Sequence, residues 1–232
     1  MQAAADAMPM PVSDPSLANR WLKANLLAAI TIPLTAGVLP IVADRTFPGL
    51  SDATFSWVSA AVSAIAVVVC LTVYATLTGA VLREKLPAFS RRTWIGGHLA
   101  FSAVWGLIMA RAELEMAPGS AWAWYMSGRQ FEASNHLFAV LVSVPVLGAL
   151  LGCFQALLLW NVARGALAWI AAFAVGCVAI VAMSRMVWNF EPISSLISND
   201  ATFVLEQSVA FAWIMVMAAI MLPAFNRLTP KN

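Results

Sequence analysis

Three arginines and two glutamates carry the chemistry that this sequence predicts. Arg45, Arg111 and Arg185 each lie at the end of a long apolar run, and Glu113 closely follows Arg111. A guanidinium stays charged and binds a carboxylate or a phosphate through a planar fork of donors. Glu206 lies inside an apolar run, where an ionisable side chain marks a candidate functional site. We expect these five residues to bind a small anionic or amphipathic solute, with Glu206 able to carry a proton.

A structural interpretation of the same residues stays open. Arginines are common where a membrane-spanning helix meets water, and each could pair with a neighbouring acid rather than with a solute. Glu206 could likewise form an ion pair with Arg185 or Arg111. In that case the charges would stabilise the fold and bind nothing.

The two histidines of the chain, His98 and His136, are predicted to lie at opposite ends of neighbouring helices. They are then too far apart to share a metal ion or to form both axial ligands of one haem. We expect each to be a hydrogen-bonded structural residue. For His98 a second hypothesis remains, namely a single axial bond to a haem or a chlorophyll, because Gly96 and Gly97 precede it and leave room beside it. No cofactor can be named from the sequence.

Other residues of the apolar runs predict packing rather than chemistry. The three cysteines, Cys70, Cys153 and Cys177, lie in separate apolar runs without a CxxC motif, which predicts neither a disulfide framework nor a metal site. Thr72 and Thr76 share one helix face, and small polar residues of this kind hydrogen-bond membrane helices to one another. Gln155 is expected to do the same. A polar vestibule lined by these groups is the alternative.

Composition determines the class of protein that must position these residues. The chain is 62% hydrophobic and 10% charged, whereas soluble domains carry roughly a quarter charged residues. We therefore predict an all-α integral membrane protein. Hydrocarbon offers no hydrogen bonds to backbone N–H and C=O groups, so a segment that does not belong to a closed barrel must form them within a helix. Six apolar runs are each close to the roughly 20 residues that span a bilayer. They are 22–42, 56–82, 94–111, 136–160, 167–185 and 203–225.

The distribution of charge predicts how these spans are oriented. With the N-terminus inside, nine Lys and Arg residues fall on the inner side and four on the outer side, which favours cytoplasmic N- and C-termini. Residues 1–20 form a polar N-terminal tail and residues 228–232 a short C-terminal tail. We predict a location in a bacterial inner (cytoplasmic) membrane.

A repeated tetrapeptide predicts the internal organisation. Asp-Ala-Thr-Phe occurs at 52–55 and again at 200–203. Trp21, Trp94 and Trp169 begin the first, third and fifth runs at nearly half that spacing. We predict three tandem parallel helical hairpins with a period of about 74, at about 21–83, 94–160 and 167–227. Each would carry a tryptophan at the inner membrane surface and an arginine at the outer surface.

Three functions are compatible with these features. The leading hypothesis is a polytopic protein that binds or transports a small anionic or amphipathic solute through an outward-facing site. The second is an accessory or scaffold subunit of a larger membrane complex, in contact with pigment or lipid. The third is a membrane enzyme that acts on lipid, although no P-loop, HExxH or GxSxG motif is present. The expected partners are the lipid bilayer, other membrane proteins or further copies of the chain, and not nucleic acid.

Overall fold

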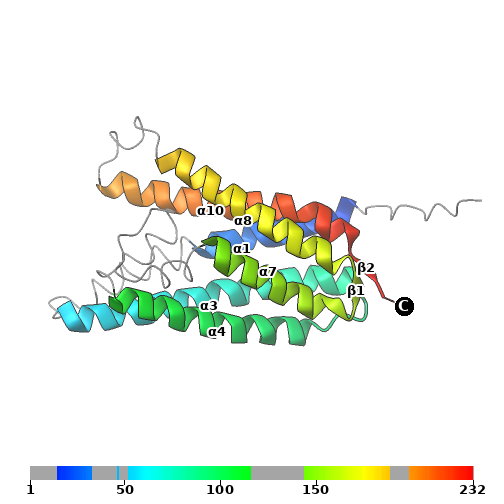
Figure 1. Cartoon of the computed structure of the whole chain (residues 1–232), viewed down its shortest axis with the longest axis horizontal. Helices are drawn as coiled ribbons and strands as arrows, with labels where there is room; N and C mark the ends of the chain where they lie inside the picture. The colour runs from blue at the N-terminus through cyan, green and yellow to red at the C-terminus, as the bar shows by residue number, and fades with distance from the viewer. Residues whose placement is uncertain (1–14, 33–45, 47–51, 116–143, 189–198, 232) are drawn as a thin grey trace, which may run out of the picture.

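The computed structural model describes residues 15–32, 46, 52–115, 144–188 and 199–231 (Figure 1). This part of the chain forms six long helices and two very short strands. The helices are α1 (Pro15–Ile32), α3 (Asp52–Lys85), α4 (Arg91–Glu115), α7 (Val144–Trp160), α8 (Ala166–Trp188) and α10 (Asn199–Arg227). The strands are β1 (Ala163–Arg164) and β2 (Thr229–Pro230). The prediction of six helical segments is confirmed.

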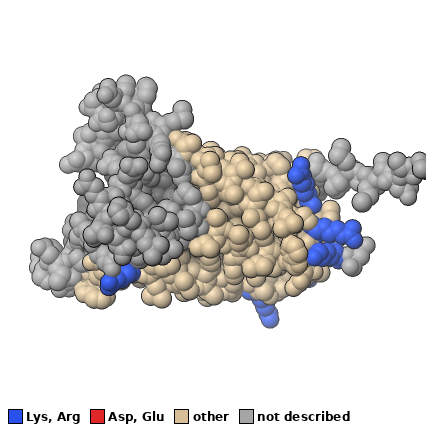
Figure 2. Space-filling model, viewed as in Figure 1, with Lys and Arg blue, Asp and Glu red and all other residues tan. Residues whose placement is uncertain are grey.

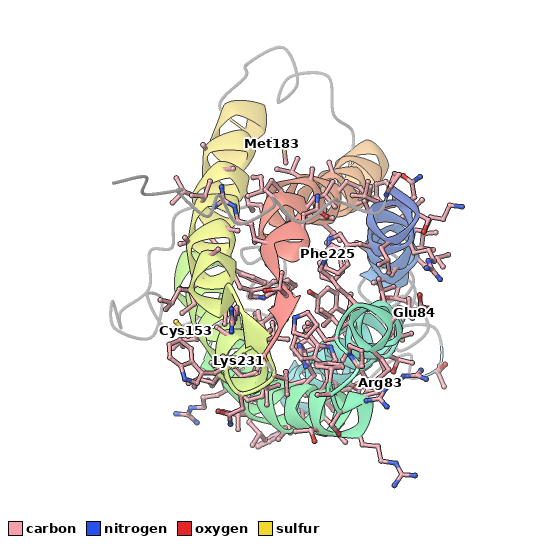
Figure 3. All side chains as sticks on the ribbon, turned by 90° about the vertical axis from the view of Figure 1, so that its right-hand side faces the viewer. Arg83, Glu84, Cys153, Met183, Phe225 and Lys231 are labelled. Atoms are coloured by element: carbon pink, nitrogen blue, oxygen red, sulfur yellow. The ribbon has the colours of Figure 1, made fainter. Side chains whose placement is uncertain are left out.

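The six helices are arranged as a ring. Each packs against the next along the chain, and α10 packs against α1 to close the ring (Figure 3). Among the described residues, the contact between α4 and α7 is the most limited of the six. One end of the ring holds the beginnings of α1, α4 and α8, the ends of α3, α7 and α10, and both strands (Figure 1, right). We call it the tryptophan end, because Trp21, Trp94 and Trp169 lie there.

These three tryptophans are fully buried in the described structure. Trp21 stacks on Phe225 with ring centroids 4.7 Å apart and meets Trp169 edge to face at 5.4 Å. The sequence predicted tryptophans at the inner membrane surface. All three rings face the interior of the bundle rather than its outside, and their depth in a membrane stays a prediction. Their rings pack against aromatic and aliphatic side chains inside the bundle, where each removes a large apolar area from solvent.

Glycines allow the helices to approach one another closely. A Cβ atom at Gly152 of α7 would lie 2.7 Å from the Cβ of Phe173 on α8, and one at Gly79 of α3 would lie 3.0 Å from the Trp94 ring. Gly148 lies one turn before Gly152 and faces Cys177 of α8 in the same way. Small residues one turn apart on one face are a common means of bringing two apolar helices together. The α7–α8 contact therefore depends on the absence of side chains at these positions.

The last residues of the chain form a strand where the sequence predicted a short tail. β2 pairs antiparallel with β1, with Ala163 opposite Pro230 and Arg164 opposite Thr229. Gly165 makes the turn into α8 with a φ of 89°, and a Cβ there would lie 2.9 Å from the carbonyl oxygen of Arg227. Only glycine combines that backbone conformation with that approach. At the other terminus, α1 begins at Pro15, so the end of the predicted N-terminal tail is helical.

Within the described residues, one helical segment, Ala60–Lys85, is long and apolar enough to cross a membrane. Three further apolar helical segments are shorter within those residues: Gly148–Trp160, Ala166–Ile180 and Ile214–Arg227. Six helices are therefore established, and the assignment of all six as membrane spans stays a prediction.

The packing of α7 on α8 generates a testable prediction. Gly152→Ala forces a methyl group against Phe173, so we expect the free energy of unfolding to fall by about 1–3 kcal/mol. Gly96→Ala is the matched control, because a Cβ at Gly96 meets nothing within 4 Å; it should be neutral or slightly stabilising. Thermal unfolding of the two purified variants measures the difference. Equal stability of the two variants would contradict this account of the α7–α8 contact.

Candidate functional site

The interior of the described bundle contains five buried polar side chains: Asn25, Thr78, His98, Ser102 and Gln155. Two of them bond only the backbone of their own helix, Asn25 to the Trp21 carbonyl at 2.9 Å and Ser102 to the Leu99 carbonyl at 2.9 Å. The other three join different helices. These three form the candidate site, because a buried polar group is costly unless it has a partner.

A continuous chain of hydrogen bonds connects α8, α7 and α4. The Trp169 Nε1 donates to Gln155 Oε1 at 2.8 Å, Gln155 Nε2 lies 2.9 Å from His98 Nε2, and His98 Nδ1 lies 2.8 Å from the Trp94 carbonyl oxygen. We call these four residues the His98–Gln155 chain. Trp169, His98 and Gln155 are fully buried, so water does not compete for their bonds.

The chemistry of the partners determines where every proton in this chain lies. An indole nitrogen only donates, so the Gln155 oxygen must face Trp169 and the Gln155 amide nitrogen must face His98. Because that nitrogen donates, His98 Nε2 must accept. The imidazole proton is then on Nδ1, which donates to the Trp94 carbonyl. His98 is thus a neutral imidazole with one tautomer selected by its two partners.

A second pair of bonds extends the network to α3. Trp94 Nε1 donates to Thr78 Oγ1 at 3.3 Å, and the Thr78 hydroxyl donates to the Tyr74 carbonyl at 2.7 Å. The His98 ring is enclosed by aromatic rings, with centroids 4.4 Å away at Trp94, 5.8 Å at Tyr74 and 5.9 Å at Phe154. The Tyr74 side chain also interacts with Gln155. Four consecutive helices of the ring therefore share one polar cluster.

Trp21 has no such bond. Its Nε1 is buried and has no hydrogen-bond partner among the described residues. Its ring is instead held by the stacking on Phe225 of α10. The contact that closes the ring between α1 and α10 is therefore aromatic at this point, whereas α4 and α8 are fastened to their neighbours by hydrogen bonds.

The arrangement can hold helices together but has little scope for chemistry by itself. Each member of the His98–Gln155 chain is neutral, and the chain contains no nucleophile and no carboxylate. Both nitrogens of His98 are occupied by protein partners. An axial bond from His98 Nε2 to a haem or chlorophyll would require the contact with Gln155 to be broken. The space beside Gly97 is filled by Phe154, whose Cζ lies 2.9 Å from the position of a Cβ.

The five predicted ligand-binding residues are only partly within the described structure. Arg45 lies outside the described residues. Arg111 is exposed near the end of α4. Glu113, Arg185 and Glu206 lie on α4, α8 and α10 by their backbone, but their side chains are outside the described part of the structure. The proposed convergence of these side chains therefore stays a prediction.

The sequence indicated some members of the polar network and missed others. Gln155 was expected to hydrogen-bond between helices, and this is confirmed. On α3 the linking hydroxyl belongs to Thr78 rather than to Thr72, whose buried Oγ1 has no partner among the described residues. Trp94 and Trp169 were recognised by their spacing but not as interior donors. The informative signal was a lone amide and a lone histidine in apolar runs, each of which needs a buried partner.

Comparisons of the sequence with family models, with curated proteins and with solved structures find no match.

The network generates a second prediction. Gln155→Leu keeps the approximate volume but leaves the Trp169 nitrogen and His98 Nε2 buried without partners. At about 1–3 kcal/mol for each group, the free energy of unfolding should fall by about 2–6 kcal/mol. Ser102→Ala removes a hydroxyl that bonds only its own helix and should cost about 1 kcal/mol or less. Thermal unfolding of both purified variants provides the comparison. A Gln155→Leu protein as stable as the Ser102→Ala protein would show that the network contributes nothing.

Proposed function

We propose that this chain is a six-span integral membrane protein that binds a small anionic or amphipathic solute at the end of the ring opposite the tryptophans. The distribution of side chains supports the membrane location. Large apolar side chains are turned outward, including Leu107 at 71% exposed, Leu157 at 70% and Val178 at 66%. The polar cluster lies inside. A soluble protein has the opposite arrangement, whereas outward apolar side chains suit a lipid environment.

The charges support one orientation in that membrane. Lys and Arg side chains gather at the tryptophan end, at the right of the face shown in Figure 2. By the bounds of the helices and strands, the described basic residues of this end are Arg20, Lys23, Arg83, Lys85, Arg91, Arg92, Arg164, Arg227 and Lys231. Basic residues are retained on the cytoplasmic side of membrane proteins. We place the tryptophan end, with both termini, in the cytoplasm of a bacterial cell.

The contacts of the three tryptophans support an organisation into three parallel hairpins with a period of about 74. Trp94 bonds Thr78 on α3, and Trp169 bonds Gln155 on α7. Trp21 packs on Phe225 of α10. In each case the tryptophan that begins one proposed hairpin contacts the second helix of another, and the third contact closes the ring. Equivalent residues with equivalent neighbours are expected of repeated units.

Helix geometry is the single observation that carries the solute site. The helices α4 and α8 both begin at the tryptophan end, at Arg91 and Ala166, and run away from it. At the rise of an α-helix, Arg111 and Arg185 each lie about 30 Å from that end. Glu206 lies a similar distance, about 30 Å, before the end of α10, which returns to the tryptophan end. The backbones of Arg111, Arg185 and Glu206 thus lie at one height of a closed ring, where we expect their two guanidiniums and one carboxylate to bind an anion together.

The packing of the tryptophan end favours binding over an open pore. Trp21, Trp94, Trp169 and Phe225 are fully buried there, and the donors of Trp94 and Trp169 have partners. A solute that enters from the end opposite the tryptophans would meet this filled interior, so transport would require the packed side chains to move apart. An accessory subunit, unlike a solute-binding protein, would co-purify with a partner in fixed stoichiometry. An enzyme that acts on lipid would need a nucleophile or a metal ion near the arginines.

The solute site can be tested with a panel of small carboxylates and phosphates added to the purified protein. At least one anion should raise the thermal unfolding temperature. The variants Arg111→Gln and Arg185→Gln should each weaken the binding of that anion by about tenfold or more. The variant Glu206→Gln should remove the pH dependence of the binding. Arg92→Gln, at the opposite end, is the matched control and should bind as the unmodified protein does.

Two results would contradict the site. The first is the absence of stabilisation by any anion of the panel. The second is an equal loss of affinity in Arg92→Gln, which would show a response to net charge only.

A further inference from the structure

The strand pair at the tryptophan end assembles three basic residues from two distant parts of the chain. Arg164 belongs to β1, Arg227 ends α10, and Lys231 follows β2. We call these three residues the basic ribbon. The backbone at Gly165, next to Arg164, approaches the Arg227 carbonyl so closely that a Cβ would lie 2.9 Å from it. The Lys231 amide donates to the Val162 carbonyl at 3.1 Å, which holds the end of β2 against the turn.

Most other cations at this end are bound to the protein itself. Arg20 forms an ion pair with Glu84 at 2.5 Å. Arg83 donates to the carbonyls of Pro87 and Phe89, and Arg91 donates to the Thr76 carbonyl at 3.4 Å. These bonds hold the turn between α3 and α4, and they leave the guanidiniums less available to an external anion.

Arg164 and Arg227 differ from these residues. Both are exposed, and neither side chain makes a hydrogen bond or an ion pair within the described part of the chain. The backbone of Gly165, next to Arg164, nevertheless lies against the Arg227 carbonyl, and no described acid lies on the ribbon to offset the two charges. Two guanidiniums carried on adjoining segments of backbone without an acid attract an anion, and a phosphate is the anion that their planar forks match.

A stripe of apolar side chains leads away from the ribbon along α7. Leu150, Cys153, Leu157 and Trp160 recur at the spacing of one helical turn and are all exposed, which places them on one outer face of the helix. Lys231 connects the stripe to the ribbon, because its ammonium donates to the Trp160 carbonyl and lies 5.3 Å from the centre of the Trp160 ring. Figure 3 shows Lys231 and Cys153 on the same side of the bundle.

We propose that the basic ribbon and the α7 stripe form a binding site for one anionic phospholipid. The phosphate lies between Arg164 and Arg227, Trp160 lies at the level of the headgroup, and the acyl chains lie along Leu157, Cys153 and Leu150. A free phosphate would use the arginines but not the stripe, and a neutral lipid would use the stripe but not the arginines. Tryptophans at headgroup level and basic clusters on the cytoplasmic side are the known recognition elements for such lipids. The site rests on the membrane location proposed above and is independent of the solute site at the other end.

The test is native mass spectrometry of the detergent-purified protein after addition of phosphatidylglycerol, phosphatidylcholine or inorganic phosphate. The unmodified protein should retain one phosphatidylglycerol in preference to phosphatidylcholine, and millimolar phosphate should not displace it. Arg164→Gln/Arg227→Gln should retain the lipid about tenfold less well. The matched control, Lys23→Gln/Arg92→Gln, removes two charges from the same end but away from the ribbon, and it should bind as the unmodified protein does.

Three outcomes would overturn the lipid site: equal loss in both double variants, equal retention of the two lipids, or displacement by phosphate. Size-exclusion chromatography monitors folding. If the double variant aggregates, Arg164→Gln alone carries the test with an expected loss of about threefold to fivefold. Fractionation of the producing cells separates this proposal from the previous one. Recovery of the protein in the soluble fraction would reject the membrane location, whereas recovery in membranes without lipid preference rejects only the lipid site.

Discussion

The interior of this helix ring depends on the need of buried polar groups for partners. One chain of hydrogen bonds joins Trp169, Gln155, His98 and the Trp94 carbonyl. Only one assignment of donors and acceptors fits this chain, because the indole nitrogen can only donate and the carbonyl can only accept. A shift of α7 along α8 by one residue would separate Gln155 from Trp169 and would leave both without a partner in an apolar interior. The chain of bonds therefore selects the register of α4, α7 and α8, while apolar packing alone would tolerate several.

The two ends of the ring differ in structure and in proposed role. At the tryptophan end, glycines bring the helices together, aromatic rings fill the interior, and the strand pair ties the C-terminus to the turn before α8. This end is the fixed part on which the ring is built. The proposed solute site lies about 30 Å away, at the ends of α4 and α8 and the beginning of α10. Proteins commonly place binding residues on segments that a rigid scaffold holds in position.

Part of this structure was accessible from the sequence because its physical causes are local. Long apolar runs bounded by charge predicted α4 at 94–111, and the helix covers Arg91–Glu115. The burial of Trp21 was not accessible, since an interior tryptophan and one at a membrane surface follow the same kind of residues. The strand pair was missed because such short strands have no periodicity, and the two paired segments are separated in the sequence by the whole of α8 and α10. Of the predicted site residues, Arg111 was correctly expected at the end of its helix, while convergence with Arg185 depends on side chains outside the described structure.

His98 is a neutral interior residue whose proton position is imposed by Gln155 and Trp94. Nitrogen-15 NMR of histidine-labelled protein tests it most directly. A His136→Asn protein purified without a histidine tag contains His98 as its one histidine, so the spectrum needs no assignment. We expect a protonated Nδ1 and an unprotonated Nε2. In a Gln155→Leu background the Nδ1 proton should remain on the Trp94 carbonyl, while the Nε2 resonance should shift because its hydrogen bond is lost. A protonated Nε2, or an imidazolium at neutral pH, would contradict the hydrogen-bond chain between Trp169, Gln155 and His98.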